Sequence, residues 1–313
     1  MPGAVAPARP LPDPAPRPGR TEVVAHRGAS AEAPENTLVA FARALELGAD
    51  WFELDACRCG SGELVVIHDD TLERTTDGRG PVAARSLAEL RALDAGAWKH
   101  PRFRGERIPT LREALDLARG RIGVYLEVKP CASGAVEEQA ARQGPALRAA
   151  LLEAARDSLG RTPELDLRLS RVLAASESPE PALARTAIAE VRAAAMERQV
   201  VLQSFSPVIC LTALLEAPAL RVELLVWDEP RRPEVWEEYL RWAYLLGVPG
   251  VNPPLEAVSP GRLAALRAAG KTSAVWTVDE EPDLRRLAGW GVERLITNRP
   301  DLALRVLGRS PGR

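Results

Sequence analysis

Two of the three histidines stand at the ends of short apolar runs. His26 ends the run that begins at Glu22, and His68 ends the run that begins at Leu64. Imidazole has an ordinary pKa near neutral pH, so two histidines at strand ends are suited to general acid and base catalysis. A single histidine is more often structural, so the prediction depends on its surroundings.

Three carboxylates also lie in or at the end of strand-like runs. Glu53 and Asp55 are two residues apart in a strand-like segment, so both side chains project from one face. Adjacent carboxylates repel each other unless they are solvated or share a cation, and oxygen ligands favour a hard ion such as Mg²⁺ or Ca²⁺. Glu127 ends another apolar run and supplies a third carboxylate. An E-x-D pair alone is more often exposed charge, but three such residues predict one divalent cation as the cofactor.

Two basic residues accompany these groups. Arg27 follows His26, and Lys129 lies two residues after Glu127. Both can hold phosphate oxygens, whereas the alternative for Lys129 is a surface ion pair with Glu127. Together with the carboxylates and imidazoles, they predict a metal-bound phosphoester site.

Alternating apolar runs and amphipathic segments predict the elements that carry this site. Parallel strands joined by right-handed helical crossovers follow from such alternation. Eight of them can close into an α/β (β/α)₈ TIM barrel, whose active site lies at the carboxyl ends of the strands. An open doubly wound sheet is the alternative. The eight strands are expected at 22–26, 51–59, 122–127, 200–204, 221–226, 248–251, 273–278 and 292–296, with a hairpin partner at 64–68. Helices are expected at 36–47, from Thr110 onwards, and at 207–217, 233–246, 259–269 and 281–289.

Two segments exceed ordinary crossovers. Residues 69–109 lack a simple period, and long irregular loops in compact enzymes are usually functional. Residues 131–199 form an extended insertion between the third and fourth strands, with helices expected near 140–157 and 181–198. The charged, Ser- and Pro-containing stretch 161–181 between them is typical of a mobile connection.

Composition limits the remaining possibilities. With 41 basic and 43 acidic residues, the chain lacks the charge that drives non-specific nucleic-acid binding. No apolar run suggests a membrane span or stable membrane insertion. Residues 1–20 read as a disordered Pro-rich tail without a secretory signal, and 21–308 as one barrel domain. The four cysteines suggest no disulfide framework, so a cytoplasmic location is expected, and ordinary strand packing is favoured over a zinc site for Cys57 and Cys59.

Short motifs in a fixed order add a family resemblance. Over residues 22–303 the chain resembles the glycerophosphodiester phosphodiesterase family. The matching segments are H-R-G at 26–28, P-E-N-T at 34–37, E-L-D at 53–55, H-D-D-T-L-E-R-T-T at 68–76, G-E-R-I-P-T-L at 105–111, E-V-K at 127–129, Q-S-F at 203–205, W-T-V at 276–278 and I-T-N-R-P-D at 296–301.

The resemblance implies a TIM barrel whose insertion 69–109 partly covers the active-site mouth. It also implies roles: the metal ligands are Glu53, Asp55 and Glu127, the acid and base are His26 and His68, and the phosphate ligands are Arg27 and Lys129. Glu35 and Asn36 would bind or support the metal and phosphate, and Trp276 would line the substrate pocket. A buried barrel residue is the alternative for Trp276.

The implied reaction is metal-dependent hydrolysis of a small-molecule glycerophosphodiester to sn-glycerol 3-phosphate and an alcohol. The sequence leaves the head group, the ion, the first nucleophile and the oligomeric state open. A lysophospholipase D-type enzyme acting on a lipid is one alternative, and a catalytically silent barrel that binds phosphodiesters or a partner is another. One departure from the family is Asn298, which stands where its T-D-R-P-D motif has the first Asp.

Overall fold

A computed structural model describes residues 11, 13–17, 19–130, 134–156, 161–228 and 232–309, the side chains of 134–143 and 233 excepted. Its strands are β1 (Glu22–Ala25), β2 (Trp51–Arg58), β3 (Leu64–Val66), β4 (Gly123–Val128), β5 (Val200–Ser204), β6 (Arg221–Leu225), β7 (Gly250–Asn252), β8 (Ala274–Val275) and β9 (Arg294–Thr297). Its α-helices are α1 (Leu38–Leu47), α2 (Leu87–Ala92), α3 (Leu111–Ala118), α4 (Gly134–Ala154), α5 (Pro163–Ala174), α6 (Pro179–Ala193), α7 (Pro207–Glu216), α8 (Pro233–Leu246), α9 (Pro260–Ala268), α10 (Glu281–Gly289) and α11 (Pro300–Val306).

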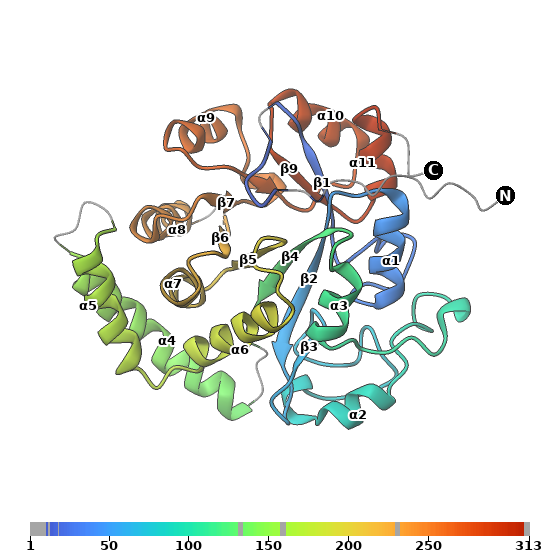
Figure 1. The fold of residues 1–313 in the computed structure, drawn as a ribbon, viewed down its shortest axis with the longest axis horizontal. Coiled ribbons are helices and arrows are strands. Elements are labelled where there is room, and N and C mark those ends of the chain that lie inside the picture. Colours follow the sequence, from blue (N-terminus) through green and yellow to red (C-terminus); the bar gives the residue numbers. More distant parts are fainter. Residues whose placement is uncertain are drawn as a thin grey trace.

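The parallel strands form a nearly closed barrel. Their order is β7-β6-β5-β4-β2-β1-β9-β8, and β3 pairs antiparallel with β2 as the predicted hairpin. Parallel bridges from Gly250 to Thr272 and from Pro254 to Trp276 join the two ends of this order. Figure 1 shows the helices arranged around the strands. The predicted (β/α)₈ barrel is therefore confirmed, and the open doubly wound sheet is excluded.

Local sequence signals explain several element boundaries. Thr37 caps α1 by accepting a hydrogen bond from the backbone of Ala40, and Gly48 ends that helix with φ +83°. Thr110 and Glu113 form a capping box at the start of α3. The helices α7, α8, α9 and α10 begin and end within two residues of their predicted bounds.

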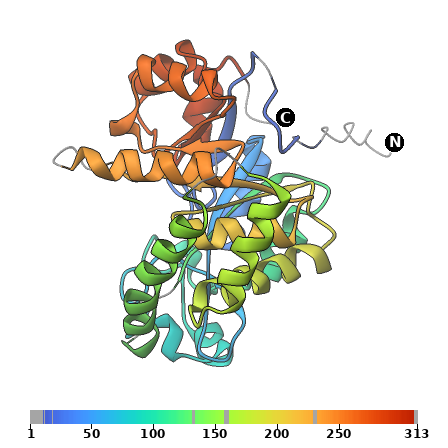
Figure 2. The same cartoon turned by 90° about the vertical axis from the view of Figure 1, so that its left-hand side faces the viewer.

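The segment 161–181 differs from its prediction. Residues Pro163–Ala174 form α5, so a mobile connection is wrong for this stretch. Thr162 caps the helix, and the buried Leu165, Leu169 and Leu173 recur at a four-residue spacing on one face. Helix α4 contacts both α5 and α6, and Figure 2 shows α4 and α5 lying side by side. The apolar stripe outweighs the charge and proline that suggested mobility.

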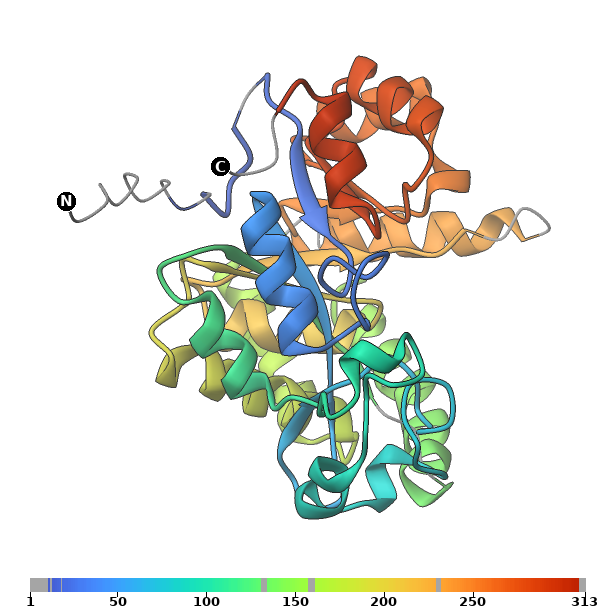
Figure 3. The same ribbon diagram turned by 90° about the vertical axis from the view of Figure 1, so that its right-hand side faces the viewer.

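The irregular segment after β3 remains largely without regular structure. Its one α-helix is α2, flanked by two short 3₁₀ helices at Val82–Ala84 and Pro101–Phe103. Figure 3 shows this segment gathered at one end of the molecule, beyond α1 and α3. Its own small core contains Leu72, Leu90 and Ile108. The insertion is thus a packed unit attached to the β2–β3 hairpin.

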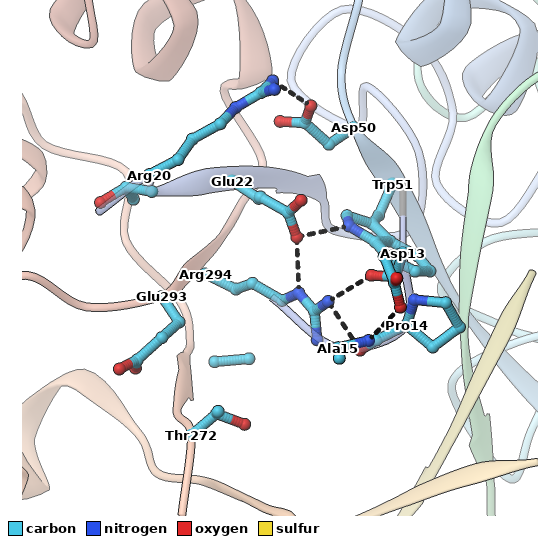
Figure 4. A network of polar contacts seen from close by, with 12 residues as sticks. Asp13, Pro14, Ala15, Arg20, Glu22, Asp50, Trp51, Thr272, Glu293 and Arg294 are labelled. Atoms are coloured by element: carbon cyan, nitrogen blue, oxygen red, sulfur yellow. Dashed lines mark hydrogen bonds and ion pairs between the residues drawn. The ribbon is translucent and has the colours of Figure 1, made fainter. Parts of the chain in front are cut away.

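Charged groups occupy the base of the barrel, where the strands begin. The side chain of Arg294 is 1% exposed and donates from Nε to Glu22 Oε2 at 2.9 Å. Its Nη2 donates to the backbone oxygens of Asp13 and Pro14 at 3.1 and 2.9 Å (Figure 4). Its guanidinium also lies over the ring of Trp51. The described part of the predicted tail therefore contacts the barrel; residues 1–10, 12 and 18 lie outside the described residues.

The cysteines depart from the expectation. Cys57 is disulfide-bonded, whereas Cys59 and Cys210 are buried free thiols. For Cys57 the bond replaces the ordinary strand packing that was expected, and the cytoplasmic location stays a prediction. Sequence spacing alone cannot show which thiols meet in space.

No described helix combines the length and the low charge that crossing a membrane requires.

Candidate active site

The predicted metal ligands meet at the carboxyl ends of two neighbouring strands. The parallel register of β2 and β4 sets Asp55 beside Glu127, and Glu53 lies two residues earlier on β2. One carboxylate oxygen from each of the three lies within 4.8 Å of those from the other two. Glu53 and Asp55 are buried, and Glu127 is partly buried. The strand alternation that predicted this grouping thus brings the three residues together.

The pKa values of the three carboxyls shift in different directions. Burial raises the pKa of Glu53 well above its ordinary value, and the charge of Asp55 adds to the shift. Burial and Asp55 likewise raise the pKa of Glu127. Burial would also raise the pKa of Asp55, but Arg27 and Lys129 outweigh it and hold that pKa at about 2. The cluster therefore lacks enough positive charge to keep all three carboxyls ionised near neutral pH.

Arg27 and Lys129 both face this carboxylate cluster. The Nε atom of Arg27 lies 3.3 Å from Asp55 Oδ2, and its backbone N–H donates to Glu53 Oε2 at 2.9 Å. Lys129 Nζ lies 3.8 Å from Asp55 Oδ1. The surface ion pair with Glu127 is not the arrangement observed for Lys129.

Glu35 and Asn36 take different positions. Asn36 donates from Nδ2 to Asp55 Oδ2 at 2.7 Å, so it orients a predicted metal ligand. Glu35 instead accepts from Arg27 Nη1 at 2.8 Å and does not belong to the carboxylate cluster. Arg27 and Asn36 have φ of +54° and +56°, a region that costs non-glycine residues energy and is concentrated at functional sites.

Each catalytic histidine candidate is held through Nδ1. His26 Nδ1 lies 2.8 Å from Asn298 Oδ1, and its Nε2 lies 3.9 Å from Glu53 Oε2. His68 Nδ1 lies 2.6 Å from Asp69 Oδ1. Burial lowers the pKa of His26 to about 4, and Arg27 contributes; burial also lowers the pKa of His68. In both rings Nδ1 makes the contact with an oxygen atom, so Nε2 is the nitrogen that remains available to a substrate.

Both imidazoles line one cavity of about 550 Å³, part of which is open to solvent. Charged groups including Arg27, Glu53 and Glu127 form part of its wall. An apolar part of the wall contains Trp276, whose Nε1 donates to the backbone oxygen of Asn252 at 2.9 Å. Trp276 is therefore both a packed barrel residue and a cavity residue. Such a cavity suits a substrate with a charged centre and an apolar flank.

Several site residues were not predicted. Phe205 and Trp227 complete the apolar wall, and Trp227 is 50% exposed. Their rings contact Trp276 edge-on or tilted, with centroids 5.7 and 5.9 Å away. Phe205 directly follows β5, and Trp227 lies two residues after the end of β6; this position near a strand end is the signal that was available. Arg74 and Asp69 lie in the irregular insertion, and the motif at 68–76 is the signal that was available for them.

Known proteins are similar to this chain over most of its length. The sequence profile of the "Glycerophosphoryl diester phosphodiesterase family" matches residues 26–154 and 172–302. A glycerophosphodiester phosphodiesterase of Caldanaerobacter subterraneus is 31% identical over 290 residues, covering 92% of this chain and 98% of that protein. A Bacillus subtilis glycerophosphodiester phosphodiesterase is 28% identical, covering 92% of this chain and 87% of its own.

Solved structures are similar over the same span. An Oleispira antarctica phosphodiesterase, in complex with the product sn-glycerol-3-phosphate, aligns with a TM-score of 0.70 at 25% identity. The alignment covers 92% of this chain and 96% of that one. A glycerophosphodiester phosphodiesterase from Agrobacterium tumefaciens aligns with a TM-score of 0.64 at 30% identity, over 91% of this chain and 99% of that one.

Proposed function

Because this chain belongs to the glycerophosphoryl diester phosphodiesterase family and is a phosphodiesterase, we propose that it hydrolyses glycerophosphodiesters to sn-glycerol 3-phosphate and an alcohol with the help of one divalent cation. The observation that carries the proposal is the cluster of three carboxylates, two of which, Glu53 and Glu127, line the same cavity as both imidazoles. The Oleispira enzyme, which holds sn-glycerol-3-phosphate as its product, supports that substrate class.

The donor set fits a hard cation. Glu53, Asp55 and Glu127 offer three carboxylate oxygens within 4.8 Å of one another, and two of these groups have raised pKa values because they lie buried next to Asp55. A shared cation relieves this repulsion, and oxygen ligands favour Mg²⁺ or Ca²⁺ over softer metals. When bound, such an ion neutralises charge on phosphoryl oxygens.

Arg27 and Lys129 are assigned to the phosphate. Each lies within 4 Å of an Asp55 oxygen, so their positive charge is directed at the same point as the carboxylates. Basic groups fixed in place stabilise charge that grows on phosphoryl oxygens in the transition state. A fixed guanidinium requires no reorganisation during the reaction.

His26 and His68 are assigned to proton transfer. Each has Nδ1 occupied by an oxygen acceptor, which leaves Nε2 for the substrate. One Nε2 removes the proton from the attacking hydroxyl, which is either water or the substrate's glycerol 2-hydroxyl. The other Nε2 gives a proton to the departing alkoxide. Each transfer contributes about 10²- to 10⁴-fold to the rate.

A second candidate is a lysophospholipase D-type reaction on a lipid. The observation that favours it is the exposed apolar face of Trp227 beside Phe205 at the cavity. A lipid substrate would place an acyl chain against such a face. The reaction at phosphorus would be the same, so the two candidates differ only in the group that the aromatic wall contacts.

One assay distinguishes these candidates. Purified protein is incubated with glycerophosphocholine, glycerophosphoethanolamine or lysophosphatidylcholine, in Mg²⁺, Ca²⁺ or chelator. We expect glycerol 3-phosphate from the first two substrates and no product with chelator. Turnover of lysophosphatidylcholine alone would replace the first proposal by the second. Absence of turnover on every substrate with either ion would reject both.

A further inference from the structure

A single guanidinium in the insertion lies between two carboxylates at the edge of the active site. Arg74 donates from Nε to Asp69 Oδ2 at 2.5 Å and from Nη2 to Asp69 Oδ1 at 2.9 Å. It also donates from Nη1 to Glu35 Oε2 and from Nη2 to Glu35 Oε1, both at 2.8 Å. Both carboxylates are therefore held in the two-point geometry that planar guanidinium favours.

Asp69 connects Arg74 to His68. Asp69 Oδ1 accepts from Arg74 and also lies 2.6 Å from His68 Nδ1. The hydrogen bond from Arg74 is the main cause that lowers the pKa of Asp69, so this group is ionised and can only accept. The Nδ1 atom of His68 must then carry the proton, and Nε2 is the atom available to the substrate. Arg74 thus holds the carboxylate of Asp69, and that carboxylate holds the imidazole of His68.

Glu35 connects Arg74 to Arg27. Glu35 Oε1 accepts from both Arg74 Nη2 and Arg27 Nη1, each at 2.8 Å. Arg27 then extends to Asp55, whose Oδ2 lies 3.3 Å from its Nε. A continuous polar chain therefore connects an imidazole to a metal-ligand carboxylate through Arg74.

The competing explanation is an ordinary surface ion pair. The side chain of Arg74 is 43% exposed, and isolated exposed pairs contribute little to stability. Arg91 of the same insertion forms such a pair with α3 for comparison, because it makes two hydrogen bonds to Glu113 at 3.0 and 2.8 Å. Arg91 and Glu113 do not line the catalytic cavity. Arg74 differs from Arg91 in that both of its carboxylates contact groups assigned to the reaction.

We propose that Arg74 is a positioning residue that sets the orientation of His68 through Asp69 and of Arg27 through Glu35. The inference rests on the proposed function, since it assigns proton transfer to His68 and phosphate binding to Arg27. It gives the insertion a role beyond covering the mouth: the segment 69–109 delivers a guanidinium that aligns catalytic groups from two different strand ends.

The test compares three variants with glycerophosphocholine as the probe. Arg74→Ala removes both links, and Arg74→Lys keeps the charge but offers no planar guanidinium. Arg91→Ala removes a matched two-point pair between the insertion and α3. We expect Arg74→Ala to lower kcat/KM by about 10²-fold, the scale of a small misalignment of catalytic groups. We expect a lower kcat because the His68 ring loses its orientation for proton transfer. We expect a higher KM because Arg27 loses its orientation for phosphate binding. Arg74→Lys should remain near the alanine variant, and Arg91→Ala near wild type.

Chemical rescue separates positioning from folding. Guanidinium ion at millimolar concentration, far below the molar range that unfolds proteins, should restore activity to Arg74→Ala, whereas sodium chloride of equal ionic strength should not. Retention of wild-type kcat and KM in Arg74→Ala would overturn the inference. So would a loss confined to kcat and insensitive to guanidinium, which indicates a smaller folded fraction. If wild type itself leaves the substrate intact, the proposed function has failed, rather than the role of Arg74.

Discussion

The Nδ1 atom of His26 lies 2.8 Å from the Oδ1 atom of Asn298, the residue that directly follows β9. Asn298 Nδ2 donates to Asp279 Oδ2 at 2.6 Å, and this contact fixes which amide atom faces the imidazole. His26 Nδ1 is therefore the donor. The position at which the chain departs from its family's motif thus still orients the ring that we propose for proton transfer, with Asp279 as the acceptor behind it.

Substituting Asn298→Asp should destabilise the protein by about 1–3 kcal/mol. The change removes the donor to Asp279 and places two carboxylates in contact. Asp279 also accepts from Thr297 Oγ1 and from the backbone N–H of residue 298, so its position is fixed. Urea denaturation of the variant measures the loss.

A reciprocal exchange provides the control. In Asn298→Asp/Asp279→Asn the new amide can donate to the new carboxylate, so most of the lost stability should return. The interaction energy of the double-mutant cycle should be favourable. Additive losses in the double variant would show that the two side chains are not coupled.

Replacing His68 with alanine should lower kcat by about 10²- to 10⁴-fold, because one proton transfer is lost. The side chain is 38% exposed, so the thermal midpoint should change little. His100→Ala is the matched control, since His100 is the remaining histidine and does not line the cavity. Full activity in His68→Ala would remove this residue from the chemistry.

The stability of the metal-free protein should fall as pH rises from about 6.5 to about 8. Burial, with the charge of Asp55, raises the pKa of Glu127 from 4.5 to about 8. The folded protein therefore binds a proton that the unfolded chain releases, and this contribution is lost as pH rises through the folded pKa. His26 acts in the opposite direction, but only between its ordinary 6.5 and its folded value of about 4, so it does not affect this window.

A divalent cation should reverse this loss. Bound carboxylates are ionised, so the increase in thermal midpoint on adding Mg²⁺ or Ca²⁺ should be larger at pH 8 than at pH 6.5. Glu127→Gln should flatten the pH dependence of the metal-free protein. An equal increase at both pH values would contradict the assigned electrostatics.

Substituting Arg294→Ala should destabilise the barrel by about 3–5 kcal/mol, because it leaves buried carboxylates without their partner. Glu22 and Glu223 both lie within ion-pair distance of this guanidinium, and all three side chains are 1% exposed. Arg267→Ala is a suitable control, since that arginine pairs with Glu293 at a more exposed position. A loss below that of the control would contradict the assigned role of Arg294.

The barrel could be predicted from sequence because most of its strands are short buried runs followed by a helix, as β5 is followed by α7 with Ser206 as its N-cap. Asp55 and Glu127 could be grouped in advance because parallel strands end at one edge. Arg74 lies in the motif at 68–76, but its pairing with Glu35 could not be predicted, since the two residues meet only in the folded chain. Helix α5 was not predicted because the charged residues and prolines of this stretch mask the four-residue spacing of its buried leucines.

Trp227 illustrates another limit of the sequence. It directly follows the described strand β6 and its flanking valine, a position that favours the active-site edge, yet a lone tryptophan is more often a core residue. Only its contacts with Phe205 and Trp276 place it in the cavity wall. Packing between loops, which decides such contacts, has no short-range signal in the chain.

The central claim is that Glu53, Asp55 and Glu127 share one cation next to the two imidazoles. Anomalous diffraction from crystals soaked in Mn²⁺, a probe for the hard-ion site, tests it most directly. We expect one strong peak within about 2–2.6 Å of oxygens from all three carboxylates. A peak elsewhere, or none in crystals of protein that Mn²⁺ activates, would contradict it.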